Sequence, residues 1–216
     1  MYTQIDAMKI DDKTLIMPIG LPASGKSSFL KELQGQHGDR IVVVSFDAVV
    51  EAMGAERQMS YGDIMALLEV DAEAKAESGV LYTALVERAK AHTGIVFWDQ
   101  TNLTERERKK KQELFPDFKK IGVFFDITVE ESKRRCEERF ERTGKFIPPD
   151  VIEKMGEWLA KGFPQQDEFD VLYHRDSKGV MTPYVFPPEN PQNDGADKKV
   201  GNEAGAKAKT VVLRPK

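Results

Sequence analysis

Short, continuous apolar runs recur along the chain and alternate with stretches of helical character. The apolar runs lie at residues 14–19, 41–45, 95–98 and 121–126, and a further candidate lies at 171–174. Runs that are apolar throughout, and not only at every second position, are typical of strands buried on both faces, as in parallel sheets. The segments between them that are predicted to be helical are 26–33, 61–92, 104–115 and 130–143. This alternation predicts an α/β fold in which a parallel sheet carries helices on both faces.

Pro18 lies inside the first apolar run. Proline has no N–H to donate to a neighbouring strand, and within sheets it is found mainly at edges, strand starts and bulges. We therefore expect Pro18 to mark a strand end or a bulge.

The sequence GLPASGKS, residues 20–27, lies between the first predicted strand and the first predicted helix. It matches the pattern GxxxxGK[ST], in which glycines let successive N–H groups converge on phosphate oxygens at the start of a helix. In this pattern Lys26 brings positive charge to the β- and γ-phosphates of a nucleotide and the Ser27 hydroxyl ligates Mg²⁺. A glycine-rich turn without a ligand is the alternative, and the flanking strand and helix disfavour it. The motif predicts the P-loop NTPase fold, with a nucleotide held by Gly20, Ser24, Gly25, Lys26, Ser27 and Ser28.

Carboxylates follow the second and third predicted strands, at Asp47 and Asp99. Ligands of open parallel sheets bind beyond the carboxyl ends of the strands, so both carboxylates should face the crevice that holds the phosphate loop. One of them could hold Mg²⁺ and the other could accept a proton from an attacking hydroxyl. Asp47 also has a structural alternative, as the N-cap of a helix predicted at 48–53.

The composition argues against several classes of protein. The 216 residues include 32 basic and 36 acidic side chains, and the net charge of −4 disfavours a protein that coats nucleic acid through bulk positive charge. A single cysteine, Cys136, leaves no intramolecular disulfide and no cysteine zinc cluster. No stretch approaches the ~20 apolar residues of a membrane helix, and the first 13 residues do not resemble a signal peptide. We therefore expect a cytoplasmic protein without a membrane partner.

The composition changes near the end of the chain. Residues 187–209 contain one valine and no aromatic side chain, which is too little apolar surface to offset the entropy of ordering. We expect one domain over residues 1–186 and a polar, disordered tail over residues 187–216.

Several further segments resemble a known family. The chain carries SFD at 45–47, WDQTNLTERER at 98–108, and an arginine-rich helix that runs into RTGKFIPPDVIEKM at 142–155. Together with GxxxxGKS, these segments resemble the P-loop kinases of the polynucleotide 5′-hydroxyl kinase type. The resemblance implies an ATP- and Mg²⁺-dependent kinase with a helical lid, whose acceptor is the 5′-hydroxyl end of a nucleic acid.

Carried onto this sequence, the resemblance implies roles for individual residues. Asp47 would be the general base that activates the acceptor hydroxyl, and Lys26 and Ser27 would serve ATP and Mg²⁺. Arg142 would be the lid arginine that stabilises charge on the transferring phosphoryl group. The other residues expected to contact the acceptor or the metal are Asp99, Thr101, Asn102 and Arg139, with Asp99 a candidate metal ligand. Spacings of four and three residues place Arg135, Arg139 and Arg142 on one face of their predicted helix.

One departure from the family bears on the acceptor. The polynucleotide kinases carry an arginine three residues after the base aspartate, which contacts nucleic-acid phosphate, and here that position is Val50. Arg57 and the basic run at 106–111 are the nearest candidates to replace it, although a charged helix face is usually only solvated. Two alternatives therefore stay open: a kinase of a small metabolite, nucleoside or sugar nucleotide, and an ATP-binding switch protein without transferase activity.

Overall fold

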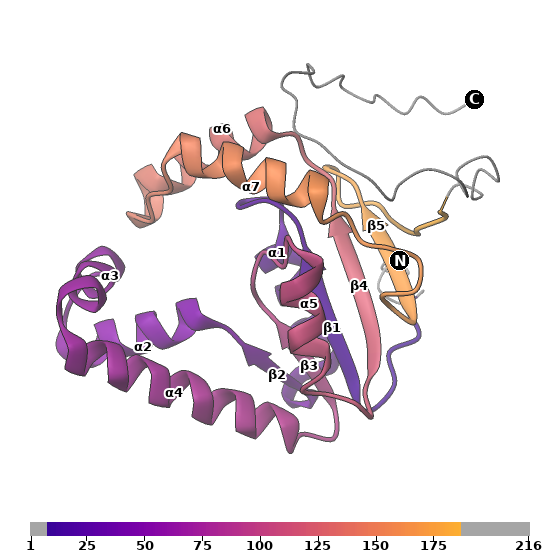
Figure 1. Ribbon diagram of the computed structural model, residues 1–216, viewed down its shortest axis with the longest axis horizontal. Helices are drawn as coiled ribbons and strands as arrows, with labels where there is room; N and C mark the ends of the chain where they lie inside the picture. The colour runs from indigo at the N-terminus through magenta and orange to yellow at the C-terminus, as the bar shows by residue number, and fades with distance from the viewer. Residues whose placement is uncertain (1–7, 187–216) are drawn as a thin grey trace, which may run out of the picture. The chain divides into compact units, whose positions relative to one another are not determined.

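A six-stranded sheet organises residues 8–186, the part of the chain that the computed structural model describes (Figure 1). In spatial order the strands are β2 (Ile41–Val44), β3 (Ile95–Trp98), β1 (Thr14–Ile19), β4 (Lys119–Phe125), β5 (Val171–Arg175) and β6 (Met181–Pro183). The first five run parallel, and β6 pairs antiparallel with β5. The predicted α/β fold is confirmed. Residues 8–185 belong to one compact unit, and the predicted tail, 187–216, lies outside the described residues.

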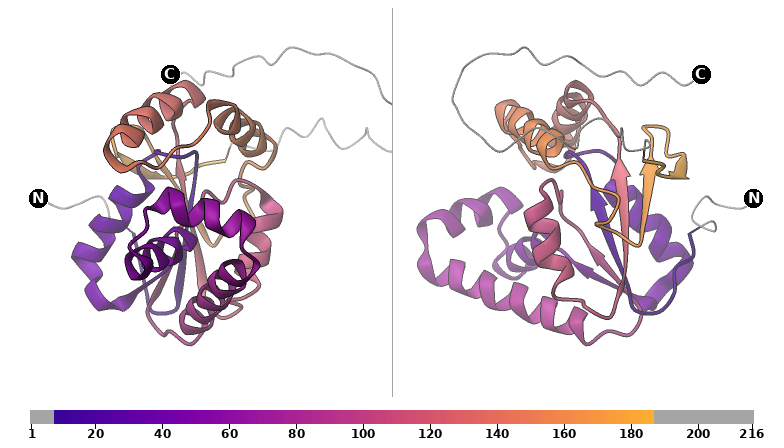
Figure 2. Two further views of the ribbon diagram at one scale, coloured as in Figure 1. Left: turned by 90° about the vertical axis from the view of Figure 1, so that its left-hand side faces the viewer. Right: turned by 45° about the vertical axis from the view of Figure 1, so that its right-hand side comes forward.

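Helices cover both faces of this sheet. They are α1 (Lys26–His37), η2 (Gly38–Arg40), α2 (Phe46–Arg57), α3 (Tyr61–Val70), α4 (Ala72–Lys90), α5 (Glu105–Gln112), α6 (Val129–Thr143) and α7 (Pro149–Lys161). In the left view of Figure 2, α1 lies on one side of the sheet and α5 on the other. The α6–α7 pair lies across the top in Figure 1 and is called the lid below, while α2, α3 and α4 extend to the left. None of the described helices is long and apolar enough to cross a membrane.

The helix predicted over 61–92 is two helices. The chain breaks at Asp71, which has an extended backbone (φ −109°, ψ 111°) and accepts a hydrogen bond from the Ala74 N–H at 2.8 Å. Asp71 therefore ends α3 and caps α4, because a side-chain oxygen at this position satisfies an N–H that the new helix leaves unpaired. Helix α7 and strand β6 have no counterpart in the sequence-based prediction, and α7 begins with Pro149 in its first turn, where a missing N–H costs nothing.

Pro18 lies within β1 and is neither at its end nor in a bulge, so that prediction was wrong. It faces Val123 in the β1–β4 register. The backbone groups of Thr14 and Gly20 face the β3 side of β1, because their N–H groups donate to the carbonyls of Gly94 and Thr101. Pro18 shares that side, where the β1–β3 register extends only from residue 14 to residue 16. The N–H that proline lacks would therefore point toward β3, beyond the last residue of β1 that pairs with β3.

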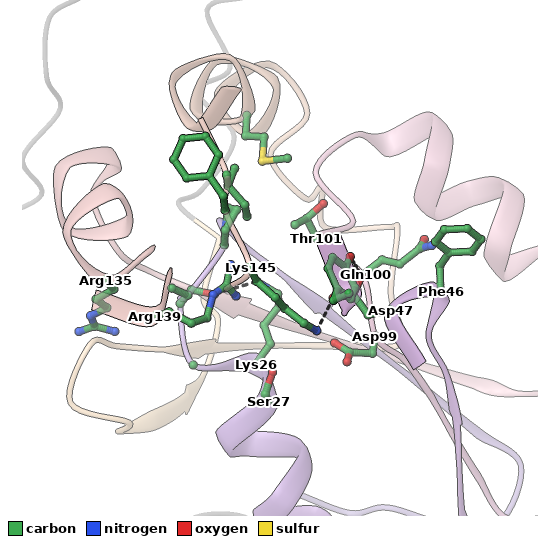
Figure 3. Close-up of a pocket in the computed structure, with 18 of the residues that line it drawn as sticks. Lys26, Ser27, Phe46, Asp47, Asp99, Gln100, Thr101, Arg135, Arg139 and Lys145 are labelled. Atoms are coloured by element: carbon green, nitrogen blue, oxygen red, sulfur yellow. Dashed lines mark hydrogen bonds and ion pairs between the residues drawn. The ribbon is translucent and has the colours of Figure 1, made fainter. Parts of the chain in front are cut away.

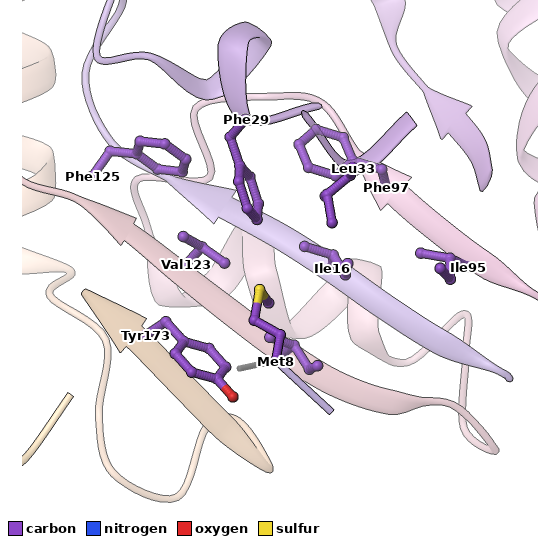
Figure 4. Close-up of a cluster of buried hydrophobic side chains, with 10 residues drawn as sticks. Met8, Ile16, Phe29, Leu33, Ile95, Phe97, Val123, Phe125 and Tyr173 are labelled. Carbon is purple, nitrogen blue, oxygen red and sulfur yellow. The ribbon is translucent and has the colours of Figure 1, made fainter. Parts of the chain in front are cut away.

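The main core lies between α1 and the sheet. Phe29 and Leu33 of α1 pack against Ile16, Phe97 and Val123, and all five side chains are fully buried (Figure 4). Phe29 also makes an edge contact with Phe125, with ring centroids 5.7 Å apart. Because Phe29 lies in the first turn of α1, this packing fixes where the helix begins relative to the end of β1.

A second apolar cluster holds α2, α3 and α4 together. Val50 and Met53 of α2 pack with Ile64 of α3, and each of the three has an exposed fraction of 0%. Val50, the position at which the polynucleotide kinases carry an arginine, is therefore a core residue. A charged side chain at this position would leave the packing of the three helices incomplete or its own charge unpaired.

One member of the basic run at 106–111 is buried. The Arg108 guanidinium has an exposed fraction of 0%, pairs with the Glu168 carboxylate through Nε and through Nη2 (2.8 Å), and donates from Nη1 to the Asn102 carbonyl at 3.0 Å. Arg108 thus ties the segment after β3 to the segment before β5. It is unavailable to a nucleic acid, contrary to the hypothesis for the whole run.

Arg108→Met is expected to lower the free energy of unfolding by about 3–5 kcal/mol, because it leaves the Glu168 carboxylate buried without its partner. Urea unfolding followed by circular dichroism measures this change. Arg106→Met, an exposed arginine of the same helix, is the matched control and should change stability by less than about 0.5 kcal/mol. A loss of under 1 kcal/mol in Arg108→Met would show that the pair does not anchor these segments.

Candidate active site

The phosphate loop turns tightly between β1 and α1. Gly25 lies directly before α1 with φ 104°, and no side chain caps the helix, so its first N–H groups are open to an anion. A Cβ at Gly20 would lie 2.9 Å from the carbonyl oxygen of Phe125. Each glycine is therefore required for its own reason, Gly25 for its left-handed backbone and Gly20 for the close approach of β4.

Lys26 is buried in this loop. Its ammonium donates to the carbonyls of Gly20 (3.0 Å) and Leu21 (2.6 Å) and to the Ser24 hydroxyl (3.1 Å). Burial lowers its pKa to about 8, and this effect outweighs the opposing charge of Asp99, while Arg139 acts in the same direction as burial. Lys26 is thus an ammonium whose charge the protein stabilises incompletely, as expected of a group that receives an anion.

Asp47 lies in the first turn of α2, but it does not cap the helix. The N-cap is Ser45, whose hydroxyl accepts from the Ala48 N–H, so the structural alternative for Asp47 is wrong. The Asp47 side chain is 58% exposed and points into the pocket. Its Oδ1 accepts a hydrogen bond from the Tyr61 hydroxyl at 2.9 Å, and its Oδ2 lies 3.5 Å from the Lys145 ammonium.

Asp99 follows β3 on the same edge of the sheet. Its backbone N–H donates to the Val44 carbonyl at 2.9 Å, which fixes the strand end, and its side chain lines the pocket with that of Thr101. Burial raises the pKa of the Asp99 carboxyl, and the nearby Lys26 opposes that rise. Asp99 and Lys26 therefore each favour the charged form of the other, but burial has the larger effect on both pKa values.

Asn102 lies at the pocket wall, but all of its polar atoms bond within the protein. The side chain is 1% exposed; its amide donates to the carbonyls of Pro18 (2.7 Å), Trp98 (3.2 Å) and Gln100 (3.0 Å), and its Oδ1 accepts from Lys111 (2.8 Å). The side chain of Asn102 therefore stabilises the loop after β3.

Three arginines of α6 line the pocket from the lid side (Figure 3). Arg135 pairs with Glu131 of the same helix at 2.6 Å. The Nε of Arg139 is buried and has no hydrogen-bond partner among the described residues. Arg142 is exposed at the end of α6, and within residues 8–186 its side chain has no ion-pair partner. Among the three, Arg139 and Arg142 therefore lack the carboxylate partner that Arg135 has within the described residues.

These side chains surround one pocket of about 970 Å³. It brings together the predicted residues Ser24, Gly25, Lys26, Ser27, Ser28, Asp47, Asp99, Thr101, Asn102, Arg139 and Arg142. Gly20 lies behind its wall, against Phe125. Arg57 pairs with Glu77 and does not line the pocket, so it does not replace the arginine missing at Val50.

Sequence reasoning gave no role to the pocket residues Tyr61 and Lys145, and it considered Lys111 only as part of the basic run at 106–111. Tyr61 and Lys145 both contact Asp47, and Lys111 lies between Asn102 and the ring of Trp98, 5.9 Å from the ring centroid. Lys145 lies in the RTGKFIPP segment, so the family resemblance could have pointed to it. Tyr61 carries no sequence signal, because only the packing of α3 on α2 brings it to Asp47.

The donor set fits a nucleoside triphosphate with Mg²⁺. The buried Nε of Arg139 and the open N–H groups at the start of α1 are donors for phosphate oxygens. The Ser27 hydroxyl and the Asp99 carboxylate line the pocket beside Lys26 (Figure 3). The described residues contain no cluster of three or more metal-binding side chains, and none is needed, since Mg²⁺ at nucleotide sites takes one or two protein ligands together with phosphates.

Comparison with known proteins agrees with this geometry. The family model AAA_33, described as an AAA domain, matches residues 15–161, about two thirds of the chain. The chain belongs to this AAA-domain family. Together, the family, the phosphate loop and the strand order assign it the fold of the P-loop kinases.

Three solved structures share this fold. A chain of the Pnkp1/Rnl/Hen1 RNA repair complex is 20% identical, with a TM-score of 0.52 over 85% of this chain and 52% of the other. The AAA-domain protein thus spans about half the length of that chain. A chain of the PezAT toxin–antitoxin system of Streptococcus pneumoniae is 15% identical (TM-score 0.57; 82% and 73% covered). A proposed kinase of Chloroflexus aurantiacus is 18% identical (TM-score 0.53; 77% and 89% covered).

ATP affinity is expected to fall about tenfold between pH 7.5 and 9, since Lys26, with a pKa of about 8, loses its proton in the free protein over this range. Bound phosphate favours the charged ammonium and raises the pKa, so binding at pH 9 should take up a proton. Isothermal titration calorimetry in buffers of different ionisation enthalpy measures both effects.

Two variants separate Lys26 from the other lysine with a lowered pKa. Burial lowers the pKa of Lys111 to about 8 as well, and Lys111 lines the same pocket. Lys111→Met should keep the pH dependence and Lys26→Met should abolish it. An unchanged dependence in Lys26→Met would exclude Lys26 as its source.

Proposed function

We propose that this AAA-domain protein is an ATP- and Mg²⁺-dependent kinase that transfers the γ-phosphoryl group to a hydroxyl, and that its acceptor is the 5′-hydroxyl of a nucleic acid. The observation that carries the proposal is that one pocket is lined by Lys26 and Ser27 of the phosphate loop and by the exposed carboxylate Asp47. A phosphate cradle facing a carboxylate, with arginines beside them, supplies what phosphorylation of a hydroxyl needs.

In the proposed reaction, the acceptor oxygen attacks the γ-phosphorus while its proton passes to Asp47. The bond between the γ-phosphorus and the β,γ-bridging oxygen breaks, and ADP leaves. Since Asp47 Oδ1 accepts from Tyr61, Oδ2 is the oxygen that takes the proton. Asp47 also orients the hydroxyl in line with the leaving group, which contributes because the transition state of phosphoryl transfer is loose.

The remaining side chains stabilise charge on the phosphates. Lys26 gives up its contacts with the loop carbonyls and donates to the triphosphate instead. Arg139 and Arg142 donate from the lid to the transferring group, whose negative charge spreads over its equatorial oxygens. Ser27 and Asp99 would hold Mg²⁺, which would supply positive charge to the triphosphate when bound.

The nucleic-acid acceptor has support from the sequence segments around Asp99 and Arg142 that resemble the polynucleotide kinases. The likeness in fold to a chain of an RNA repair complex agrees with it. Lys111 also lines the pocket and offers positive charge in place of the arginine missing at Val50. A strand end that enters this pocket needs only such local charge, so a net charge of −4 is no obstacle.

A small-metabolite or nucleoside acceptor is the second candidate. It is favoured by the burial of Val50 and by the Arg57–Glu77 ion pair, which leave the α2 side of the pocket without a free arginine for a backbone phosphate. A switch protein without transferase activity is the candidate from another class, and it differs in that no acceptor would increase its turnover of ATP.

Asp47→Asn is expected to lower the rate of phosphate transfer by about 10²–10⁴-fold, because a carboxamide cannot accept the acceptor's proton. The measurement uses γ-labelled ATP with Mg²⁺ and compares a 5′-hydroxyl oligonucleotide, a 3′-nucleotide and a panel of nucleosides. Lys26→Ala should abolish transfer to each of them, since the triphosphate loses its cation.

Asp150→Asn, an exposed carboxylate of α7 outside the pocket, is the matched control and should transfer at the wild-type rate. Label on nucleosides but on no oligonucleotide would replace the proposed acceptor with the second candidate. Full activity in Asp47→Asn would remove Asp47 from the role of base.

A further inference from the structure

Two side chains divide the oxygens of Asp47 between them. The Tyr61 hydroxyl donates to Oδ1 at 2.9 Å, and the Lys145 ammonium lies 3.5 Å from Oδ2. Lys145 also donates to Glu51 at 2.5 Å and lies over the ring of Tyr61, 4.3 Å from its centroid. The oxygen that the proposed reaction needs is therefore the one that a lysine covers.

Tyr61 acts as a donor only. Burial raises the pKa of its phenol well above the usual value, and the charge of Asp47 raises it further, so the hydroxyl stays protonated at any physiological pH. Since a protonated phenol in this contact donates, Oδ1 is engaged and Asp47 is held in one orientation. Oδ2 is left to the acceptor, provided that Lys145 moves aside.

Lys145 reaches Asp47 from the other wall of the pocket. It lies in the turn between α6 and α7, 98 residues from Asp47 along the chain, whereas Glu51 and Tyr61 belong to α2 and α3. Figure 3 shows it beside Asp47 and Asp99. The contact thus joins the lid to the α2–α3 wall across the place where an acceptor hydroxyl has to lie.

We propose that Tyr61 and Lys145 together select the acceptor over water: Tyr61 is a positioning residue that holds Oδ1 of Asp47, and Lys145 covers Oδ2 until an acceptor displaces it. The inference rests on the proposed function, since it assigns a use to the proposed base. Water at Oδ2 would pass its proton to Asp47 and attack the γ-phosphorus, giving ADP and inorganic phosphate. A lysine on Oδ2 removes the base from that side reaction.

The ion pairs of Lys145 with Asp47 and Glu51 are weak enough for an acceptor to displace them. The Lys145 side chain is 22% exposed and its two carboxylate partners are each 58% exposed, so the ion pairs are partly hydrated. Partly hydrated pairs of this kind shift an equilibrium by about two- to fivefold. An acceptor that binds elsewhere in the pocket can displace such a lysine, whereas a single water molecule competes with it poorly.

Lys145→Met is expected to raise ATP hydrolysis in the absence of acceptor by about two- to fivefold and to lower the KM for acceptor by a similar factor. The kcat for transfer should stay within about twofold of wild type, so fewer phosphates reach the acceptor per ATP consumed. Lys145→Arg keeps the charge and should restore wild-type hydrolysis. Released phosphate and labelled acceptor, measured in one reaction, give both rates.

Tyr61→Phe should behave differently. It removes the hydrogen bond to Oδ1 but leaves Lys145 in place, so kcat for transfer should fall about tenfold with no change in the KM for ATP. Tyr173→Phe, in the core on β5, is its control, and Lys154→Met, a lid lysine paired with Asp150 at 3.6 Å, is the control for Lys145. Thermal melting of every variant verifies that each is folded.

The outcomes separate this inference from the proposed function. A wild type that transfers phosphate, with hydrolysis unchanged in Lys145→Met, overturns the inference alone. So does a higher KM for acceptor in that variant, which would make Lys145 an acceptor-binding residue. An unchanged kcat in Tyr61→Phe removes the positioning role.

The hydrolysis rate is measured without acceptor, so this part of the test holds whether the acceptor is a nucleic acid or a nucleoside. A wild type that turns over no ATP with any acceptor overturns both.

Discussion

The side chain of Asn102 is the contact on which the pocket's geometry depends. It joins the end of β1, through the Pro18 carbonyl, to the end of β3, through the Trp98 carbonyl, at the one place where β1 is not paired with β3. Arg108 and Lys111 in turn hold the backbone and the side chain of Asn102. The phosphate loop continues from β1 and Asp99 from β3, so this amide, together with the bond from the Gly20 N–H to the Thr101 carbonyl, sets the spacing between the two groups that face a bound phosphate.

Two cations of the pocket, Lys26 and Arg139, are incompletely stabilised by the protein itself. Lys26 rests on carbonyl and hydroxyl oxygens, and burial lowers its pKa to about 8. Arg139 keeps a buried N–H without a partner among the described residues. A buried donor left unpaired costs free energy, so the empty pocket is less stable than one that holds an anion. Binding of an anion satisfies this donor and relieves that cost. In this sense the site is preorganised for an anion.

The features that could be predicted from the sequence are those that depend on residues close together along the chain. The first and third strands and the phosphate loop follow from short apolar runs and two glycines, each read within about ten residues. Asp71 was missed because its N-cap role interrupts a stretch that is otherwise helical on both sides. The roles of Tyr61, Lys145 and Arg108 depend on partners 14, 98 and 60 residues away, and no local pattern encodes such pairs. The polar residues predicted for the site all line one pocket, and among them Asn102 bonds only within the protein.

The burial of Val50 explains why the lid turn reaches so far across the pocket. In this chain one face of α2 is committed to packing, with Val50 and Met53 against Ile64, while Asp47 and Glu51, on a different face, are exposed. A helix that presents two carboxylates and no cation to the acceptor side needs positive charge from elsewhere, because two unpaired carboxylates so close repel one another and any phosphate. Lys145 supplies that charge from the lid, so the charge of the two α2 carboxylates and the position of the lid turn are linked through one ammonium group.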